Sequence, residues 1–286
     1  MKKVLLVLLL ALLVSLLPVS CGSGGGVHKI SDHSGFFPTW SPDGQKIALK
    51  YYNGIYTMNA DGSDGTEVLD GVIGIGGLAW SSDGTRIAVA WNAGIWTCAP
   101  DGSNFTPIFP LSYSDRLWGV SWSPDGGRIA FARPVRDEGG WDIYVVDADG
   151  GNEVKLTSEE TDDYAPSWSP DGSKIAFHSA GDPSRPWDIY VMNADGGERA
   201  RLTDGPGSSY APAWSPDGSR IAFTSKRDGE PQIYLMDADG SNVTRLIETS
   251  IRVSSYGLAW SPDGTRIAFS GLSESDDGYI YVVDVP

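Results

Sequence analysis

The chain has 286 residues, of which 41% are hydrophobic and 20% are charged, as is typical of a globular protein with a substantial core. It contains 37 Asp and Glu residues against 21 Lys and Arg residues, a net charge of −16. Nucleic acids and anionic lipid head groups are bound by basic patches, so this balance argues against both as partners.

Residues 1–20 are typical of a secretory signal peptide. Two lysines follow the initiating methionine, and an apolar run then extends from Val4 to Leu17. The run has 14 residues, whereas an ordinary membrane-spanning helix needs about 20. We therefore expect an exported protein whose folded part begins after this segment.

The cysteine that follows the signal segment is the expected site of lipidation. The junction Val19-Ser20-Cys21 resembles the end of a bacterial lipobox, although Pro18 stands where that pattern prefers leucine. The Gly-rich residues 21–26 would serve as a flexible tether that holds a domain off a membrane. The expectation is a periplasmic or other extracytoplasmic protein, anchored to the cell envelope by lipid at Cys21. Cleavage by the ordinary signal peptidase and an uncleaved anchor are the alternatives.

A ten-residue phrase occurs six times, with variations, between residues 39 and 268. It first reads TWSPDGQKIA, and the spacings between successive tryptophans are 40, 42, 46, 46 and 46 residues. Such a period is typical of propeller blades or of helical repeats. Each period contains four short runs rich in Ile, Val, Tyr and Phe, separated by Gly, Pro and Asp, without a sustained helical period. The tryptophans are Trp40, Trp80, Trp122, Trp168, Trp214 and Trp260.

This pattern predicts an all-β fold over residues 27–286, a six-bladed β-propeller with four antiparallel strands per blade. Ser-Pro-Asp-Gly and Ala-Asp-Gly suit tight hairpin turns, because Pro presets φ and Gly accepts the left-handed conformation. The last repeat ends at its third strand, YIYVVDVP, while residues 28–31 match the fourth strand of other repeats. We therefore expect the N-terminal strand to complete the last blade and close the ring.

The repeat resembles that of a known family. Trp-Ser-Pro-Asp-Gly followed by Ile-Ala-Phe, and Ile-Tyr-x-Met/Val-x-Ala-Asp-Gly followed by Leu-Thr, resemble the repeats of TolB-type propellers. The propeller halves of prolyl-oligopeptidase-like enzymes carry a similar repeat. The resemblance extends over about residues 27 to 286 and implies a propeller; for TolB-type proteins it also implies an envelope protein partner. The α/β domain that precedes the propeller in TolB is absent from this sequence, and so is a G-x-S-x-G nucleophile elbow.

Histidines and acidic turns are the candidates for catalysis or metal binding. His28, His33 and His178 show no ligand spacing such as H-x-x-x-H, so we expect solvent-facing or edge residues. Segments 59–67 and 147–153 resemble calcium loops but lack the full ligand spacing, and Asp-Gly is also ordinary turn chemistry. Cys98 stands where other repeats carry Met or Val, so it should be a core hydrophobe. We predict no catalytic residue, no metal site and no cofactor.

The candidate binding site consists of the residues four positions before each tryptophan. They should lie at the start of the innermost strands and converge on one mouth of the central channel, on the face with the long, variable loops. Asp115, Arg116, Asp162 and Asp163 lie beside them in sequence and would add polarity. The alternative is that the aromatic residues pack between blades. The six positions are Phe36, Gly76, Trp118, Tyr164, Tyr210 and Tyr256.

Together these features predict a non-enzymatic, monomeric binding or scaffold propeller that binds an envelope protein, peptide or glycan through this mouth. Its contact with a membrane would be through the lipid anchor alone. The alternative is a metal-dependent lyase or lactonase-like hydrolase in the channel mouth, which would need carboxylate, amide or imidazole groups converging on the axis. A purely structural propeller is a third hypothesis, and the charged loops around Arg136 and Arg227 are a second candidate surface.

Overall fold

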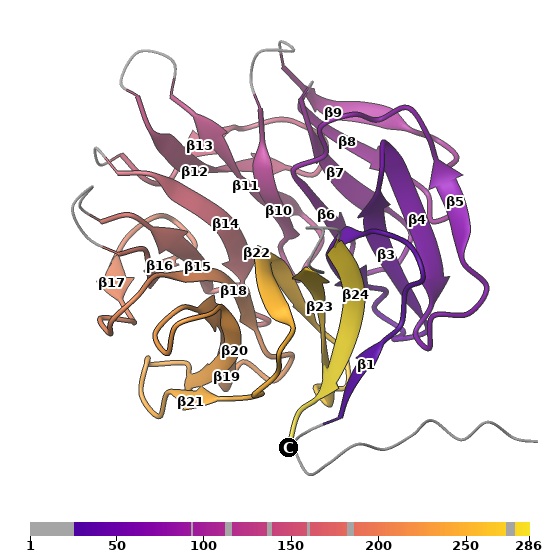
Figure 1. Ribbon diagram of the computed structural model, residues 1–286. Coiled ribbons are helices and arrows are strands. Elements are labelled where there is room, and N and C mark those ends of the chain that lie inside the picture. Colours follow the sequence, from indigo (N-terminus) through magenta and orange to yellow (C-terminus); the bar gives the residue numbers. More distant parts are fainter. Residues whose placement is uncertain are drawn as a thin grey trace, which may run out of the picture.

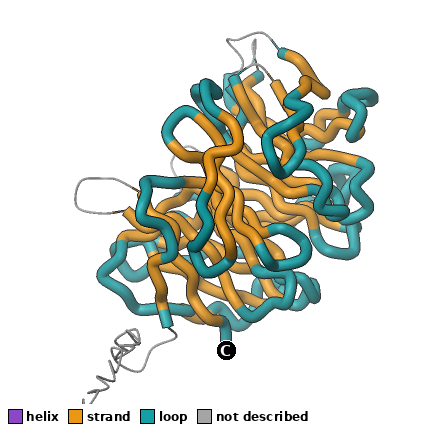
Figure 2. Tube along the Cα trace, turned by 90° about the vertical axis from the view of Figure 1, so that its right-hand side faces the viewer, coloured by secondary structure: helices purple, strands orange, loops and turns teal. Residues whose placement is uncertain are grey.

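The computed structural model describes residues 26–92, 94–111, 116–135, 139–158, 161–181, 186–272 and 278–286. Within these ranges the strands form six four-stranded antiparallel sheets that follow one another around a ring (Figure 1). Figure 2 shows the same residues as strands and loops, without helices. The six-bladed β-propeller predicted from the repeat is therefore confirmed.

In blades 1 to 5 the first strand lies innermost and the others follow outwards in sequence order, whereas in blade 6 the N-terminal strand takes the outermost place. Blade 1 consists of β2 (Phe36–Trp40), β3 (Lys46–Tyr51), β4 (Gly54–Asn59) and β5 (Thr66–Leu69). Blade 2 consists of β6 (Gly77–Trp80), β7 (Ile87–Trp91), β8 (Gly94–Cys98) and β9 (Thr106–Pro110). Blade 3 consists of β10 (Trp118–Trp122), β11 (Arg128–Pro134), β12 (Trp141–Asp147) and β13 (Val154–Lys155).

The remaining blades complete the ring. Blade 4 consists of β14 (Asp163–Trp168), β15 (Lys174–Ser179), β16 (Asp188–Asn193) and β17 (Ala200–Arg201). Blade 5 consists of β18 (Ser209–Trp214), β19 (Arg220–Ser225), β20 (Gln232–Asp237) and β21 (Thr244–Arg245). Blade 6 consists of β22 (Arg252–Trp260), β23 (Arg266–Leu272), β24 (Gly278–Asp284) and β1 (Val27–Lys29).

The two ends of the described chain meet in blade 6. β1 pairs antiparallel with β24, with Val27 opposite Val283 and Lys29 opposite Tyr281, and the two strands lie side by side in Figure 1. The pairing continues beyond β1, because the amide of Ile280 donates to Ser31 Oγ at 2.8 Å. The expected closure of the last blade by the N-terminal strand is confirmed.

The acidic turns are hydrogen-bonded within themselves. In the first Ser-Pro-Asp-Gly turn, Asp43 Oδ1 accepts from Ser41 Oγ at 2.6 Å and from the amide of Gln45 at 3.0 Å. These bonds lower the pKa of Asp43. In the Ala-Asp-Gly turn, a Cβ at Gly62 would collide with the carbonyl oxygen of Ile30, so glycine is required there by close packing as well as by its positive φ. The turn chemistry expected from the sequence accounts for these carboxylates.

The tryptophan of each repeat packs against the preceding blade. Trp40 shares a core cluster with Ala268 and Ile280 of blade 6, and its Nε1 donates to the carbonyl oxygen of Ala259 at 3.1 Å. The guanidinium of Arg266 lies 4.8 Å from the centre of the Trp40 ring. Equivalent hydrogen bonds join Trp122 to Ala79 and Trp260 to Ala213. The blades therefore interlock through the repeated tryptophan.

The innermost strands of all blades except blade 2 contain a β-bulge or register shift that a simple alternation of faces does not predict. On β14, Trp168 pairs with Ile175 but Tyr164 pairs with His178, so one extra residue lies between them. Ala165 has a φ of 50° at this point, and Phe37 and Ala211 have similar values at the equivalent positions. The bulge changes the register between the buried tryptophan and the aromatic residue at the mouth.

Cys98 is buried and unbonded in the core of blade 2, as expected for a small hydrophobe, and burial raises the pKa of its thiol to about 11. In the part of the chain that the structure describes, no helix has the length and apolarity needed to cross a membrane. The signal segment 1–20, Cys21 and most of the tether lie outside the described residues. Export and lipidation therefore remain predictions from the sequence.

Candidate ligand-binding mouth

Two adjoining cavities occupy the end of the ring where the innermost strands begin. The first has a volume of about 640 Å³ and the second about 580 Å³, and both include Tyr210 and Ser255 in their linings. The positions predicted from the repeat all reach this mouth. Gly76, Trp118, Tyr164 and Tyr210 line the first cavity, and Phe36, Tyr210 and Tyr256 line the second.

The first cavity has an aromatic wall from blades 3, 4 and 5. The ring centre of Tyr164 lies 4.9 Å from that of Trp141 and 5.6 Å from that of Trp187. Tyr210 continues this wall, with its ring 6.2 Å from Trp187. All four side chains are partly exposed, whereas the core ring of Phe177 on β15 is fully buried. The mouth therefore presents ring surface to solvent.

Trp141 and Trp187 were not among the sequence-predicted residues. Each stands immediately before the run Asp-Ile-Tyr of its repeat, where the third strand begins. The third strand begins at the same end of the blade as the first strand, because neighbouring strands alternate in direction. Comparing the third-strand entry points of blades 3 and 4 would have revealed this second row of rings.

His178 is buried, and the expectation of a solvent-facing or edge residue is wrong for it. Its ring is stacked on Tyr164 and touches Trp187 and Tyr210, and the amide of Ala211 donates to Nδ1 at 3.4 Å. Burial lowers the pKa of the imidazole to about 3, so it is neutral near pH 7. Tyr210 of the next blade covers it, which a single repeat cannot reveal. His28 and His33 are exposed, as expected.

A second group of rings closes the channel beneath the mouth. Tyr256 of blade 6 contacts Trp118 of blade 3, on the opposite side of the ring, and Phe37 of blade 1 contacts both. The centroid distances are 5.5, 5.6 and 5.5 Å. A further cavity of about 260 Å³ lies along the inner strands and includes these three residues in its lining. The aromatic group thus separates the mouth from the channel.

The charged residues predicted beside the mouth differ in their placement. Arg116 is exposed and lines the first cavity. Asp162 is partly buried and lines neither of the mouth cavities, and its carbonyl oxygen accepts from the amide of Ala180 at 3.1 Å. Asp115 lies outside the described residues. Lys50, which the repeat pattern does not indicate as a mouth residue, lines the first cavity from β3.

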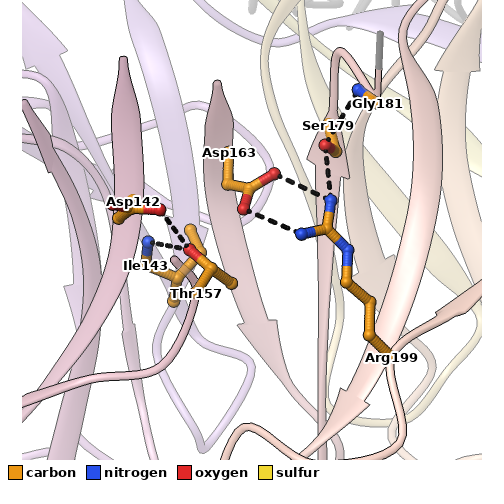
Figure 3. Close-up of polar contacts among 7 residues, drawn as sticks. All are labelled: Asp142, Ile143, Thr157, Asp163, Ser179, Gly181 and Arg199. Carbon is orange, nitrogen blue, oxygen red and sulfur yellow. Dashed lines mark hydrogen bonds and ion pairs between the residues drawn. The ribbon is translucent and has the colours of Figure 1, made fainter. Parts of the chain in front are cut away.

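Asp163 does not reach the mouth, because it is fully buried in blade 4. Figure 3 shows its carboxylate facing the guanidinium group of Arg199. Arg199 donates to its two oxygens at 3.2 and 3.4 Å and to Ser179 Oγ at 2.8 Å. Burial raises the pKa of Asp163 to about 6, and Arg199 and Ser179 oppose the rise. This pair connects the first and second strands of the blade with the start of the fourth, which is a structural role.

Two further carboxylates, those of Asp142 and Asp188, also pair with basic side chains and have a structural role. Asp142 accepts from Thr157 Oγ1 at 2.8 Å, and Lys155 Nζ lies 2.8 Å from its other oxygen. Asp188 of blade 4 repeats the arrangement with Thr203 and Arg201. Among the described residues, no group of three or more His, Cys, Asp and Glu side chains is placed to hold a metal ion.

The fold and the mouth define a six-bladed propeller with an aromatic, partly exposed channel entrance. Residues 182–269 match the family model of the TolB beta propeller domain, which supports the resemblance of the repeat to TolB-type propellers. A search of curated proteins gives no match.

Several solved structures share the fold. A TolB structure from Agrobacterium tumefaciens is 24% identical, with a TM-score of 0.69 over 91% of this chain and 97% of that chain. A gluconolactonase from Xanthomonas campestris is 15% identical, with a TM-score of 0.71 over 91% and 89% of the two chains. Oligogalacturonate lyase from Vibrio parahaemolyticus is 13% identical, with a TM-score of 0.64 over 91% and 93%. At these identities the likeness concerns the fold, which serves both binding proteins and enzymes.

Proposed function

We propose that the protein is a non-enzymatic, exported binding propeller that takes a protein, peptide or glycan partner at the cell envelope through its aromatic mouth. The observation that carries the proposal is the wall of partly exposed rings from three successive blades around a cavity of about 640 Å³. Large rings with one apolar face and one polar edge are typical of surfaces that bind partners. The cavity lies within the usual size of a ligand pocket, roughly 300 to 1,000 Å³.

Rigidity of the wall supports the same conclusion. Tyr164 and Tyr210 rest on the buried, neutral His178, and Trp141 and Trp187 stand at the entrances to paired strands. A preformed wall loses little conformational entropy when a partner binds. The likeness to TolB supports an envelope location, and the signal segment with Cys21 would bring the protein there.

An enzyme of the lyase or lactonase type remains the alternative, because proteins with those activities share the fold. Such chemistry needs acid, base or metal-binding groups at the mouth. No described Asp or Glu lines either mouth cavity. The buried carboxylates that adjoin lining rings in sequence, Asp142, Asp163 and Asp188, are each paired with a basic side chain. The binding proposal therefore accounts for more of the observed side chains.

The proposal is tested by a pull-down from envelope extract with the wild-type protein and two variants. Trp118→Ala with Trp187→Ala removes two mouth rings. Trp96→Ala is the matched control, because Trp96 is also partly exposed but lies on β8 outside the mouth, stacked on Phe105. We expect the mouth variant to lose a partner that the wild type and the control retain. Retention by all three proteins would move the binding site elsewhere, and a stoichiometric metal in the purified protein would favour the enzyme.

A further inference from the structure

Among the described residues, the charged side chains that line the mouth are cationic, although the protein as a whole is strongly anionic. Lys50 and Arg116 line the first cavity, and Lys226 and Arg252 line the second. No Asp or Glu among the described residues lines either cavity. In a chain with 37 acidic and 21 basic residues, an average surface would place more carboxylates than cations there. The local charge therefore favours an anionic ligand.

Lys50 is the cation of the mouth whose surroundings are best defined. It is half-buried on β3, and no carboxylate among the described residues forms a salt bridge with it. Burial lowers the pKa of its ammonium group, which means that the charge is incompletely solvated. Lys50 occupies the repeat position of His178, but the next blade carries Gly76 where Tyr210 covers His178. Gly76 has no side chain to cover Lys50, and Lys50 lines the cavity.

The aromatic wall indicates which class of anionic ligand would fit the mouth. Trp118, Trp141 and Trp187 offer indole faces beside the cations, while the aliphatic part of the lining is confined to Ile73, Ile75 and Leu117. A pyranose ring has a flat C–H face that stacks on indole, and hydroxyl groups at its edge that suit the amide of Asn92. The two adjoining cavities have room for several such rings. A sugar that carries a carboxylate satisfies both the rings and the cations.

We propose that the mouth binds a short acidic saccharide, with carboxylates held by Lys50 and Arg116 and sugar rings stacked on the indoles of Trp141 and Trp187. This inference rests on the proposed binding function of the mouth and names its ligand class. Because the cations lie on different blades, each carboxylate is recognised separately along the saccharide. The second cavity, lined by Lys226, extends the same path.

The test measures binding of a mannuronate trisaccharide to the full-length purified protein by calorimetry, beside its methyl ester. Esterification removes the charges and keeps the sugar rings. We expect binding of the acid, weakening with added salt, and at least about tenfold weaker binding of the ester. Lys50→Gln and Trp187→Ala should each weaken binding by about tenfold or more.

Two control variants test whether a loss of binding is specific to the mouth or follows from removing any lysine or any tryptophan. Lys46→Gln removes an exposed lysine from the other end of the same strand, β3, and Trp96→Ala removes a partly exposed indole outside the mouth. Both should bind the trisaccharide like the wild type. Equal binding of acid and ester, or equal loss in Lys46→Gln and Lys50→Gln, overturns the proposal.

The result also distinguishes this inference from the proposed function. If the trisaccharide does not bind while the mouth variant still loses an envelope partner, the mouth is a binding site but its ligand is not an acidic saccharide. An acidic peptide such as Glu-Trp-Glu that binds in place of the saccharide leads to the same conclusion. If neither the trisaccharide nor any partner depends on the mouth residues, both proposals fail.

Discussion

Tyr256 of blade 6 reaches across the propeller axis to Trp118 of blade 3, and the two ring centres are 5.5 Å apart. Because blades 3 and 6 are opposite each other in a six-membered ring, this contact closes the channel that the fold would otherwise leave open. Phe36 and Phe37 also touch Tyr256, at 5.4 and 5.5 Å. The floor of the mouth is thus made from blades that are remote in sequence.

Tyr256→Ala should destabilise the protein only moderately. The side chain is 36% exposed, and the lost ring contacts contribute about 0.5 to 1.5 kcal/mol each. We expect a loss of about 1 to 3 kcal/mol in the free energy of unfolding, measured by urea denaturation. Trp168→Ala, which removes a ring that is 6% exposed, should cost about 3 kcal/mol or more. Equal losses in the two variants would show that Tyr256 behaves as a core residue.

Acid should destabilise the protein through His178. The native imidazole has a pKa of about 3, whereas the unfolded chain has a value near 6.5. Between these values the unfolded state binds more protons, so stability falls as the pH falls below about 6.5. From pH 7 to pH 5 this residue should account for a loss of about 2 kcal/mol. His178→Gln should remove that part of the pH dependence, while His28→Gln, at an exposed site, should leave it unchanged.

Asp163 should act in the opposite direction. Its native pKa of about 6 lies above the ordinary value of 3.8, so the folded state binds more protons between these values. Stability contributed by this group therefore falls as the pH rises from about 4 to about 6. Asp163→Asn should abolish this trend when unfolding free energies are compared with wild type at pH 4, 5, 6 and 7. A constant difference between the two proteins across that range would contradict the assignment.

Ring closure through β1 should be essential for stability. Deleting residues 27–31 exposes the edge of β24, which invites pairing with another chain, and leaves the amide of Ile280 without its acceptor, Ser31 Oγ. We expect a lower melting temperature and aggregation on heating. Ser31→Ala removes two hydrogen bonds of one hydroxyl group, which accepts from the amide of Ile280 and donates to the carbonyl oxygen of His33. It should cost about 1 to 3 kcal/mol, because the buried amide loses its acceptor. A truncated protein that melts like the full chain would rule out this role of β1.

Cys21→Ser tests the lipid anchor predicted from the sequence. A buried acyl chain contributes about 0.8 kcal/mol per CH₂ group, so two or more chains anchor a protein firmly. The variant should move from the membrane fraction to the soluble fraction, as followed by immunoblotting of fractionated cells. Cys98→Ser is the matched control and should remain with the membrane, since Cys98 is buried in blade 2.

Much of the fold is encoded locally and repeatedly, which is why the sequence predicts it. In each repeat the tight turn and the tryptophan mark the same strand boundaries. Because the pattern occurs six times, it predicts the strand order more clearly than a single repeat would. Closure by β1 was predictable because the last repeat lacks a fourth strand. The β-bulge was harder to foresee: Gly119 and Gly257 indicate a left-handed residue, but Phe37 occupies the same position with a φ of 55°.

The candidate site depends on neighbours that no single repeat contains. Lys50 and His178 occupy the same repeat position, yet one borders the cavity and the other is buried, because the following blade supplies Gly76 or Tyr210. Asp163 looked like a mouth residue in sequence, but Arg199, 36 positions later, holds it inside blade 4. Contacts between blades are long-range, so the repeat locates the mouth but does not determine which side chains face it.

Because blade 6 contains both ends of the described chain, it can be completed only near the end of synthesis. Ser31 and Ile280, joined by a hydrogen bond, are 249 positions apart, so the last blade cannot be completed until nearly the whole chain has emerged. Until then β24 has no outer partner. A pull on the N-terminus of the folded protein acts first on the three residue pairs between β1 and β24. The strand that closes the ring is therefore also the point at which mechanical force would open it.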